Sequence, residues 1–108
     1  MALECKNWTV NTYEVDEWVD LVAEPATLAT VLLSNVSPTE KIRSKVRLCD
    51  LSGNHIVTLI PEKLLDVGEA YAIDINSLNI TESQKLQVQA DTVGMEFMAS
   101  GVILSPGL

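Results

Sequence analysis

Turn-forming residues interrupt this sequence about every 8–12 residues, and most segments between them alternate apolar with polar side chains. The segment KIRSKVRLCDL, residues 41–51, is the clearest case, because Ile42, Val46 and Leu48 alternate with cationic residues. Side chains that repeat with a period of two lie on opposite faces of a β-strand. No segment has the pattern of a long helix. The sequence therefore predicts an all-β fold, a single antiparallel β-sandwich or jelly-roll-like domain of about eight strands.

The segments that read as strands are residues 3–10, 26–35, 41–51, 56–60, 71–76, 85–90 and 95–104. Turns or loops are expected around Pro38, at residues 52–55 and over residues 77–84, because Gly, Asn and Pro favour turns. Residues 62–70 fit either a helical turn or an irregular loop. Residues 26–35 are apolar on both sides, so this strand is expected to be covered on both sides, within the sandwich or at a subunit contact.

Residues 85–104 read as a hairpin with a turn near residues 91–94. The side chains expected to face the core are Leu86, Val88, Ala90, Met95, Phe97 and Ala99. Gln87 and Gln89 are expected to face solvent. The second strand also carries apolar side chains on its opposite face, which an isolated monomer would expose: Met98, Val102 and Leu104. We therefore expect this outer face to contact another subunit.

A chain of 108 residues is typical of one domain that buries its own core. We divide it into an N-terminal strand with an acidic arm (residues 1–24), the sandwich core (residues 25–104) and a C-terminal tail (residues 105–108). The arm carries Trp18 among five acidic residues, Glu14, Asp16, Glu17, Asp20 and Glu24.

The formal net charge is −8, which repels the phosphate backbone of nucleic acid, so no nucleic-acid partner is expected. No run approaches the ~20 apolar residues that span a bilayer, so no membrane partner is expected. The first residues, MALECKNWTV, lack the basic start and apolar core of a signal peptide. We therefore expect a chain that is made in the cytoplasm and is not processed.

The residue types needed for catalysis are scarce. His55 is the only histidine, and it follows a turn, where an exposed structural role is expected. Nucleophilic catalysis needs a base with a partner, and nothing near His55 supplies one. Histidine-based metal sites need two or three histidines. No calcium-loop motif occurs, and the glycines are scattered. We expect no enzyme activity, no catalytic residue, no cofactor and no metal. Cys5 and Cys49 are expected to be reduced thiols, although an intermolecular bridge stays open.

Three cations, Arg43, Lys45 and Arg47, alternate onto one face of a strand in an otherwise acidic chain. One interpretation is a solvated outer face. The other is a docking surface for an acidic partner, such as residues 14–24 of a neighbouring copy with its Trp18, because patches of opposite sign steer association.

Several turn and packing positions lie in three segments, LVAEPATLATVLLSNVSPTEKIRSKVRLCDLSG, LLDVGEAYAIDINSLNITESQKLQVQAD and GMEFMASGV. They are Pro25 at the entry to a strand, a strand that ends at Asn35, a Gly68-Glu69 turn before YAIDI, and the LQVQAD to GMEFMASGV end. Together these segments, which cover residues 21–102, resemble a group of small tailed-bacteriophage virion proteins. Members of that group are single β-sandwiches of similar length.

The resemblance implies a structural component of a virion, made in the host cytoplasm: a capsid decoration (cement) protein, or a protein attached to the tail or neck. Cement proteins of this kind often sit as trimers where capsid subunits meet. A homo-oligomer, with a trimer favoured, and contact with the major capsid protein or a tail or neck protein are therefore expected. The alternative is a carbohydrate- or host-binding sandwich, which needs exposed aromatic side chains; the candidates are Trp8, Tyr13, Trp18 and Tyr71.

Overall fold

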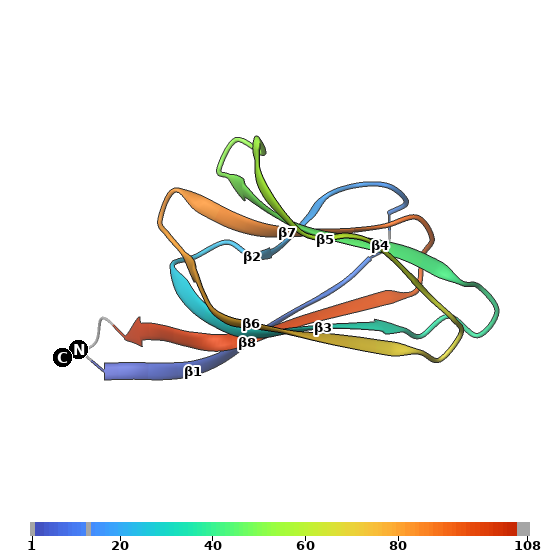
Figure 1. Ribbon diagram of the computed structural model, residues 1–108, viewed down its shortest axis with the longest axis horizontal. Coiled ribbons are helices and arrows are strands. Elements are labelled where there is room, and N and C mark those ends of the chain that lie inside the picture. The colour runs from blue at the N-terminus through green and yellow to red at the C-terminus, as the bar shows by residue number, and fades with distance from the viewer. Residues whose placement is uncertain (1, 13, 106–108) are drawn as a thin grey trace.

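The computed structural model describes residues 2–12 and 14–105, and these residues form eight β-strands and no helix. The strands are β1 (Ala2–Asn11), β2 (Val19–Val22), β3 (Ala26–Asn35), β4 (Ile42–Asp50), β5 (His55–Leu65), β6 (Ala70–Ile80), β7 (Gln84–Ala90) and β8 (Met95–Ser105). They make two four-stranded sheets that pack face to face (Figure 1). The predicted all-β sandwich is confirmed.

The strand order is β1-β8-β3-β6 in one sheet and β2-β7-β4-β5 in the other. Every pairing is antiparallel, and β1 pairs with β8, β2 with β7, β3 with β6, and β4 with β5. A long antiparallel ribbon rolled up in this way is an eight-stranded jelly roll. The sandwich therefore has two outer sheet faces, two ends where the connections lie, and two margins, one between β1 and β2 and one between β5 and β6.

The side chains between the sheets are nearly all aliphatic, and they form one continuous core. The alternating positions that were expected to face inward are buried: Ile42, Val46, Leu48, Leu86, Val88, Ala90, Met95, Phe97 and Ala99. Burial of each large aliphatic side chain contributes about 1.5–3 kcal/mol relative to its exposure. Gln87 was expected to face solvent but is buried on the outer side of β7, where polar neighbours satisfy its amide.

Residues 85–104 do not form the expected hairpin. β7 lies between β2 and β4, whereas β8 lies in the other sheet between β1 and β3. The connection at residues 91–94 carries the chain across the sandwich from one sheet to the other. A short turn between two alternating segments is compatible with a hairpin and also with a connection from one sheet to the other. The strands that pair with β7 and β8 therefore determine which of the two forms.

β5 and β6 are longer than the sequence predicted. β5 continues through Pro61, and β6 includes residues 77–80, which were expected to be loop. Proline is tolerated here because β5 is an edge strand, and its register with β4 shifts between Ser44 and Val46 beside the proline. Residues 62–65 belong to β5, and residues 66–69 form the turn into β6.

Residues 1–24, which were expected to form a strand and an arm, supply β1 and β2 and thus contribute to both sheets. β1 pairs with β8 along its whole length, and Trp8 on β1 is only 9% exposed and belongs to the core. Ser105 ends β8, and residues 106–108 of the expected tail lie outside the described residues.

Candidate interaction surfaces

The described residues contain no cluster of His, Cys, Asp and Glu side chains that could bind a metal ion. His55 is exposed, and its Nε2 lies 2.8 Å from Oγ1 of Thr58. The described residues form no helix, and so none that is long and apolar enough to cross a membrane. The residues selected from the sequence lie instead on the outer faces of the two sheets.

The two cysteines lie in different sheets, and both are free thiols. Cys5 is exposed on β1, whereas Cys49 is buried on β4. Burial raises the pKa of the Cys49 thiol above its ordinary value. Because the thiolate is the reactive form, Cys49 is the less reactive of the two. An intermolecular bridge would have to use Cys5.

Arg43, Lys45 and Arg47 lie on the outer side of β4, and Arg47 is bound closely by its own chain. Its Nε and Nη2 donate to Oε1 of Gln87 at 3.0 and 2.7 Å, and Nη2 also donates to the carbonyl oxygen of Gly53 at 3.2 Å. The guanidinium lies over the Trp18 ring, 4.1 Å from its centroid. The aromatic face and the amide oxygen therefore satisfy this cation within one molecule.

The network continues from Gln87 to β2. Nε2 of Gln87 donates to Oδ1 of Asp20 at 2.8 Å, and Nζ of Lys85 lies 3.2 Å from the same oxygen. One interpretation of the sequence paired the acidic segment with the cations of a neighbouring copy. In the structure this segment meets Arg47 within the chain, through Trp18 and, by way of Gln87, Asp20. Arg43 is more exposed and lies 3.9 Å from both Glu62 and Asp91.

The outer face of the β1-β8-β3-β6 sheet is different, because it carries almost no charge. Its described side chains come from Leu3, Cys5, Asn7, Thr9 and Asn11 on β1, Glu96, Met98, Ser100 and Val102 on β8, Thr27, Ala29, Thr30, Leu32 and Ser34 on β3, and Ala70, Ala72, Asp74 and Asn79 on β6. Glu96 and Asp74 are the only acids among them, and no Lys or Arg is present. We call this surface the neutral face.

Two shallow, open depressions lie on the neutral face. One is lined by Leu32, Met98, Phe97 and the polar side chains around them. The other lies beside Cys5 and is lined by Ala29, Ser100 and Val102. Met98 and Val102 are each partly exposed, as the sequence predicted for an outer apolar row. The side chain of Leu104, the third member of that row, lies outside the described residues.

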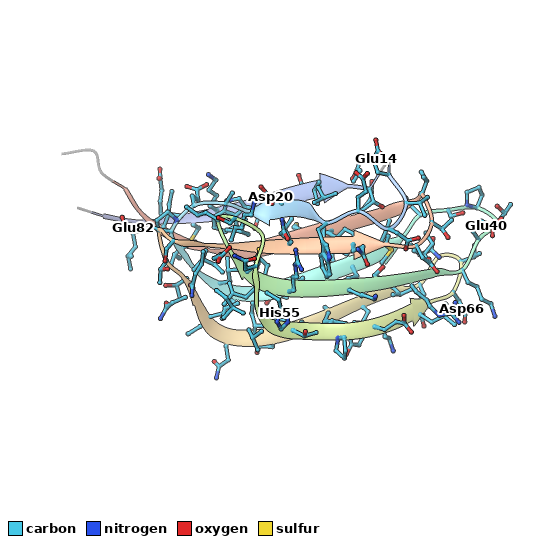
Figure 2. The ribbon with its side chains drawn as sticks, turned by 90° about the horizontal axis from the view of Figure 1, so that it is seen from above. Glu14, Asp20, Glu40, His55, Asp66 and Glu82 are labelled. Atoms are coloured by element: carbon cyan, nitrogen blue, oxygen red, sulfur yellow. The ribbon has the colours of Figure 1, made fainter. Side chains whose placement is uncertain are left out.

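One end of the sandwich is strongly acidic. The four connections at this end carry Glu14, Asp16, Glu17, Glu40, Asp66, Glu69 and Asp91. Figure 2 shows Glu14, Glu40 and Asp66 in the half of the sandwich towards this end, and Glu82 at the opposite end. Among the described residues, two cations form ion pairs with these acids: Lys41 lies 3.4 Å from Asp66, and Arg43 lies 3.9 Å from Asp91. Much of the negative charge of the chain is therefore concentrated at one end.

Glu24 closes the margin between β1 and β2. Its Oε2 accepts a hydrogen bond from Nε1 of Trp8 at 2.9 Å and forms an ion pair with Lys6. The hydrogen bond from Lys6, followed by that from the indole, lowers the pKa of the Glu24 carboxyl below its ordinary value. This connection between the sheets covers the edge of the core at Trp8.

The residues selected from the sequence fall into two groups on opposite faces of the sandwich. Trp18 and the three cations share the outer face of the β2-β7-β4-β5 sheet, and Met98 and Val102 share the neutral face. The sequence suggested a contact between residues 14–24, which include Trp18 and Asp20, and the cations of β4, but between two copies and not within one chain. Gln87 was not selected. The glutamines of β7 offered one signal, because they occupy the side of the strand that also carries the cations of β4.

No protein-family model and no curated protein matches this sequence. Among solved structures, the chain is similar to a chain of the T13 viral particle of IBDV, with a TM-score of 0.52 and 11% identity. The match covers 94% of this chain and 31% of that chain, so this protein spans about a third of the length of the viral chain. It is also similar to the NLP core of Drosophila, with a TM-score of 0.54 and 13% identity over 98% of this chain and 100% of that one.

The coat protein of Tobacco streak virus matches more weakly, with a TM-score of 0.37 and 7% identity over 99% of this chain and 88% of that chain. The NLP core is described by pentamer formation and histone binding, and the IBDV chain belongs to a viral particle. At identities this low, the likeness shows a shared fold alone. The jelly roll of this protein is thus a fold that occurs in viral particles and in a pentamer-forming protein.

Proposed function

We propose that this protein is a non-enzymatic structural component of a bacteriophage virion, a capsid decoration (cement) protein that acts through contacts between its copies and with the major capsid protein. The observation that carries this proposal is the neutral face. A partner that covers a charged surface must remove water from each charge, and a surface with two acids and no cations largely avoids that cost. Apolar groups at Leu32, Met98 and Val102 provide surface that association would remove from water.

The fold and the tailed-phage resemblance support the same proposal. The jelly roll is shared with a chain of a viral particle. The resemblance to small tailed-phage virion proteins implies a trimer at sites where capsid subunits meet, and a place in the virion after synthesis in the host cytoplasm. A protein that joins the tail or neck instead of the capsid would use the same kind of contact. Mass spectrometry of capsids separated from tails distinguishes the two locations.

Charge placed on the neutral face tests the proposal. The double substitution Met98→Lys and Val102→Lys adds two cations to this face, and we expect it to abolish trimer formation and capsid binding while the chain stays folded. Light scattering measures the first, and sedimentation with capsids measures the second. The matched control is Ile56→Lys with Leu64→Lys, two exposed apolar positions on β5. An assembled, capsid-bound Met98 and Val102 double variant would refute the proposal.

A carbohydrate-binding module is less well supported by the aromatic side chains. Trp8 is buried, Trp18 is covered by Arg47, and Lys63 Nζ lies 4.6 Å from the centroid of the Tyr71 ring. Tyr13 lies outside the described residues. Sugar rings stack on open aromatic faces. Trp8 offers none, and the rings of Trp18 and Tyr71 each have a cation over one face. Quenching of tryptophan fluorescence by sugars would favour this alternative.

The acidic end favours one other function, the binding of a basic protein by an oligomer. Seven acids gather there, and the NLP core of similar fold is described by pentamer formation and histone binding. Binding of this kind weakens steeply as salt rises, because exposed charges are screened. Titration with a lysine-rich peptide at low and high salt separates this function from a capsid contact, which depends on the neutral face.

A further inference from the structure

The four edge strands of the sandwich differ in how they are protected from pairing with another strand. β2 has only four residues. β5 contains Pro61, Glu62 and Lys63, and its register with β4 shifts three times. β1 carries Glu4 and Lys6, and Glu24 reaches across its margin. Short length, proline, charge and bulges are the features that natural proteins use to block edge pairing.

β6 has little of this protection. It runs along the same margin as β5 (Figure 2), and it contains no Lys, Arg or Pro. From Ala70 to Asp74 its pairing with β3 continues without a shift, and the positive φ values of Asn76 and Ser77 lie beyond this segment. The segment from Ala70 to Asp74 is therefore a straight, open strand edge.

The backbone of this segment presents free hydrogen-bonding groups. In an antiparallel pair, alternate residues direct both their N–H and C=O groups at the same neighbour. The N–H of Asn35 donates to the carbonyl oxygen of Glu69 at 2.9 Å, so Glu69, Tyr71 and Ile73 direct their backbone groups at β3. Ala70, Ala72 and Asp74 direct theirs at the open edge.

The margin between β5 and β6 also leaves part of the core uncovered. Tyr71 is 36% exposed and Val57 is 45% exposed, although Val57 pairs with the buried Leu48. Ile73 and Ile75 pack against the core and stay partly exposed. At the margin between β1 and β2, by contrast, Trp8 and Glu24 cover the edge of the core. The β6 edge thus combines unpaired backbone groups with uncovered apolar side chains.

We propose that β6 pairs in antiparallel fashion with β6 of a second copy, about a two-fold axis at Ala72. In this register the two Ala72 residues form a hydrogen-bonded pair. Tyr71 faces Ile73 of the other copy, an aromatic and β-branched pair that stabilises antiparallel strands. The dimer has one continuous eight-stranded sheet, and it covers the apolar margin of each copy with that of the other.

The charges of β6 favour its own copy as the occupant. Asp74 is the only charged residue from Ala70 to Ile80, and in this register it faces Ala70 of the other copy. No like charges lie opposite each other, and the small side chains of Ala70 and Ala72 permit close approach. In an isologous contact each such pair of residues occurs twice, once on each side of the two-fold axis. The β6 sequence is therefore complementary to itself.

This contact does not depend on the proposed virion role, because its hydrogen bonds come from the backbone edge of β6. The side chains of Ala70, Ala72 and Asp74 lie at the border of the neutral face, away from Met98 and Val102 on β8. If both contacts form, the protein assembles into a species larger than a trimer. Loss of the edge contact then leaves a trimer, and loss of the neutral-face contact leaves a dimer. Light scattering distinguishes these species, so the failure of one proposal is not mistaken for the failure of the other.

Proline at the edge tests the contact directly. Ala72→Pro removes an N–H that does not bond to β3, so we expect a folded protein with nearly unchanged melting temperature that has lost the dimer contact. Ala72→Ser retains the N–H and is the matched control. Sedimentation velocity over a range of concentrations measures both. An Ala72→Pro variant that associates as strongly as Ala72→Ser and wild type would overturn the proposal.

Cross-linking tests the register. In a Cys5→Ser background, which removes the exposed thiol, Ala72→Cys places two thiols across the two-fold axis at about 5.5 Å between Cα atoms, within disulfide range. We expect mild oxidation to give a covalent dimer on non-reducing electrophoresis. Ala70→Cys lies away from the axis and should cross-link far less. Equal cross-linking of the two variants, or none from Ala72→Cys, would overturn this register.

The charge pair gives a second readout that requires no oxidation. Ala70→Asp places a carboxylate opposite Asp74 of the other copy and should weaken the dimer several-fold, whereas Ala70→Lys should tighten it several-fold. Ala70 and Asp74 are four residues apart along one extended strand, so they do not contact each other within a monomer. Equal dissociation constants for the two variants would contradict the predicted pairing.

Discussion

The ring of Trp18 lies over the guanidinium of Arg47, 4.1 Å from the guanidinium carbon to the ring centroid. Trp18 precedes β2 and Arg47 lies on β4, so this contact crosses the intervening strand β7. Gln87 on β7 accepts two hydrogen bonds from the same guanidinium. The contact therefore anchors the connection between β1 and β2 to the centre of the sheet.

Removal of Arg47 should lower the free energy of unfolding. We expect Arg47→Ala to cost about 2 kcal/mol, because it leaves the buried amide of Gln87 with an unsatisfied oxygen and removes the ring contact. Urea denaturation measures this value. A double-mutant cycle with Trp18→Phe measures the interaction energy between Arg47 and the Trp18 ring. Arg43→Ala, which breaks only exposed ion pairs, should change the stability by less than about 1 kcal/mol. Equal losses for the two alanine variants would contradict this account.

Glu24 should make the stability of the protein depend on acidic pH. Its folded-state pKa is lowered by Lys6 and Trp8, so its contribution is present above the unfolded pKa and is lost as the pH falls through the folded pKa. The melting temperature of wild type should therefore fall more steeply below the ordinary glutamate pKa than that of Glu24→Gln. The difference should be small, because the side chains of Glu24 and Lys6 are each about two-fifths exposed.

Glu82, which is exposed in the connection between β6 and β7, provides the control for this pH dependence. Its replacement by Gln should leave the melting curve parallel to that of wild type at every pH. Indole N–H chemical shifts provide a local readout, because Nε1 of Trp8 donates to Glu24. If the Trp8 signal did not move as the pH fell through this range, the assigned contact would be wrong.

Asn35 should be among the most sensitive positions in the chain. It is 2% exposed, its Nδ2 donates to the carbonyl oxygens of Glu40 and Leu65, and its Oδ1 accepts from the N–H of Ser37. Asn35→Ala leaves these groups without their partner and should cost about 2–4 kcal/mol. Asn79→Ala breaks one exposed hydrogen bond to Thr27 and should cost less than about 1 kcal/mol. Thermal unfolding of the two variants checks the contrast.

The sequence correctly predicted which side chains of each strand face the core, because the period-2 pattern depends on local burial. Leu86, Val88 and Ala90 face the core as their spacing indicated. The pattern did not predict strand pairing, because β7 and β8 have the alternation of a hairpin and yet find their partners in different sheets. Pro61 was read as the end of a strand, and it is tolerated only because β5 is an edge, which the local sequence does not reveal.

The candidate surfaces were predictable only in part. The outward position of Met98 and Val102 followed from alternation, but the lack of charge around them depends on β1, β3 and β6, which the sequence does not place beside β8. Gln87 was expected to be exposed because glutamine is polar. It is buried because Arg47 and Asp20, from two different strands, satisfy both ends of its amide. That the neutral face binds a partner stays a prediction.

Gly101 should tolerate no side chain, and this constraint comes from the way β8 passes β3. A Cβ at residue 101 would overlap the carbonyl oxygen of Thr27 and lie 2.9 Å from Cα of Leu28. Here the pairing of β3 with β8 shifts between Leu28 and Thr30, beside Ala29. Gly101→Ala must push the two strands apart and should cost about 2–3 kcal/mol, at the upper end for overpacking.

Gly53 provides the comparison for Gly101. A Cβ at residue 53 would meet no atom within 4 Å, but its φ of 89° strains any other residue. Gly53→Ala should therefore cost about 1 kcal/mol, the strain of a left-handed backbone alone. Urea denaturation of the two variants separates lack of space from backbone strain. If Gly101→Ala cost no more than Gly53→Ala, the two strands would be less closely packed than described, and the depression beside Val102 on the neutral face would have no fixed shape.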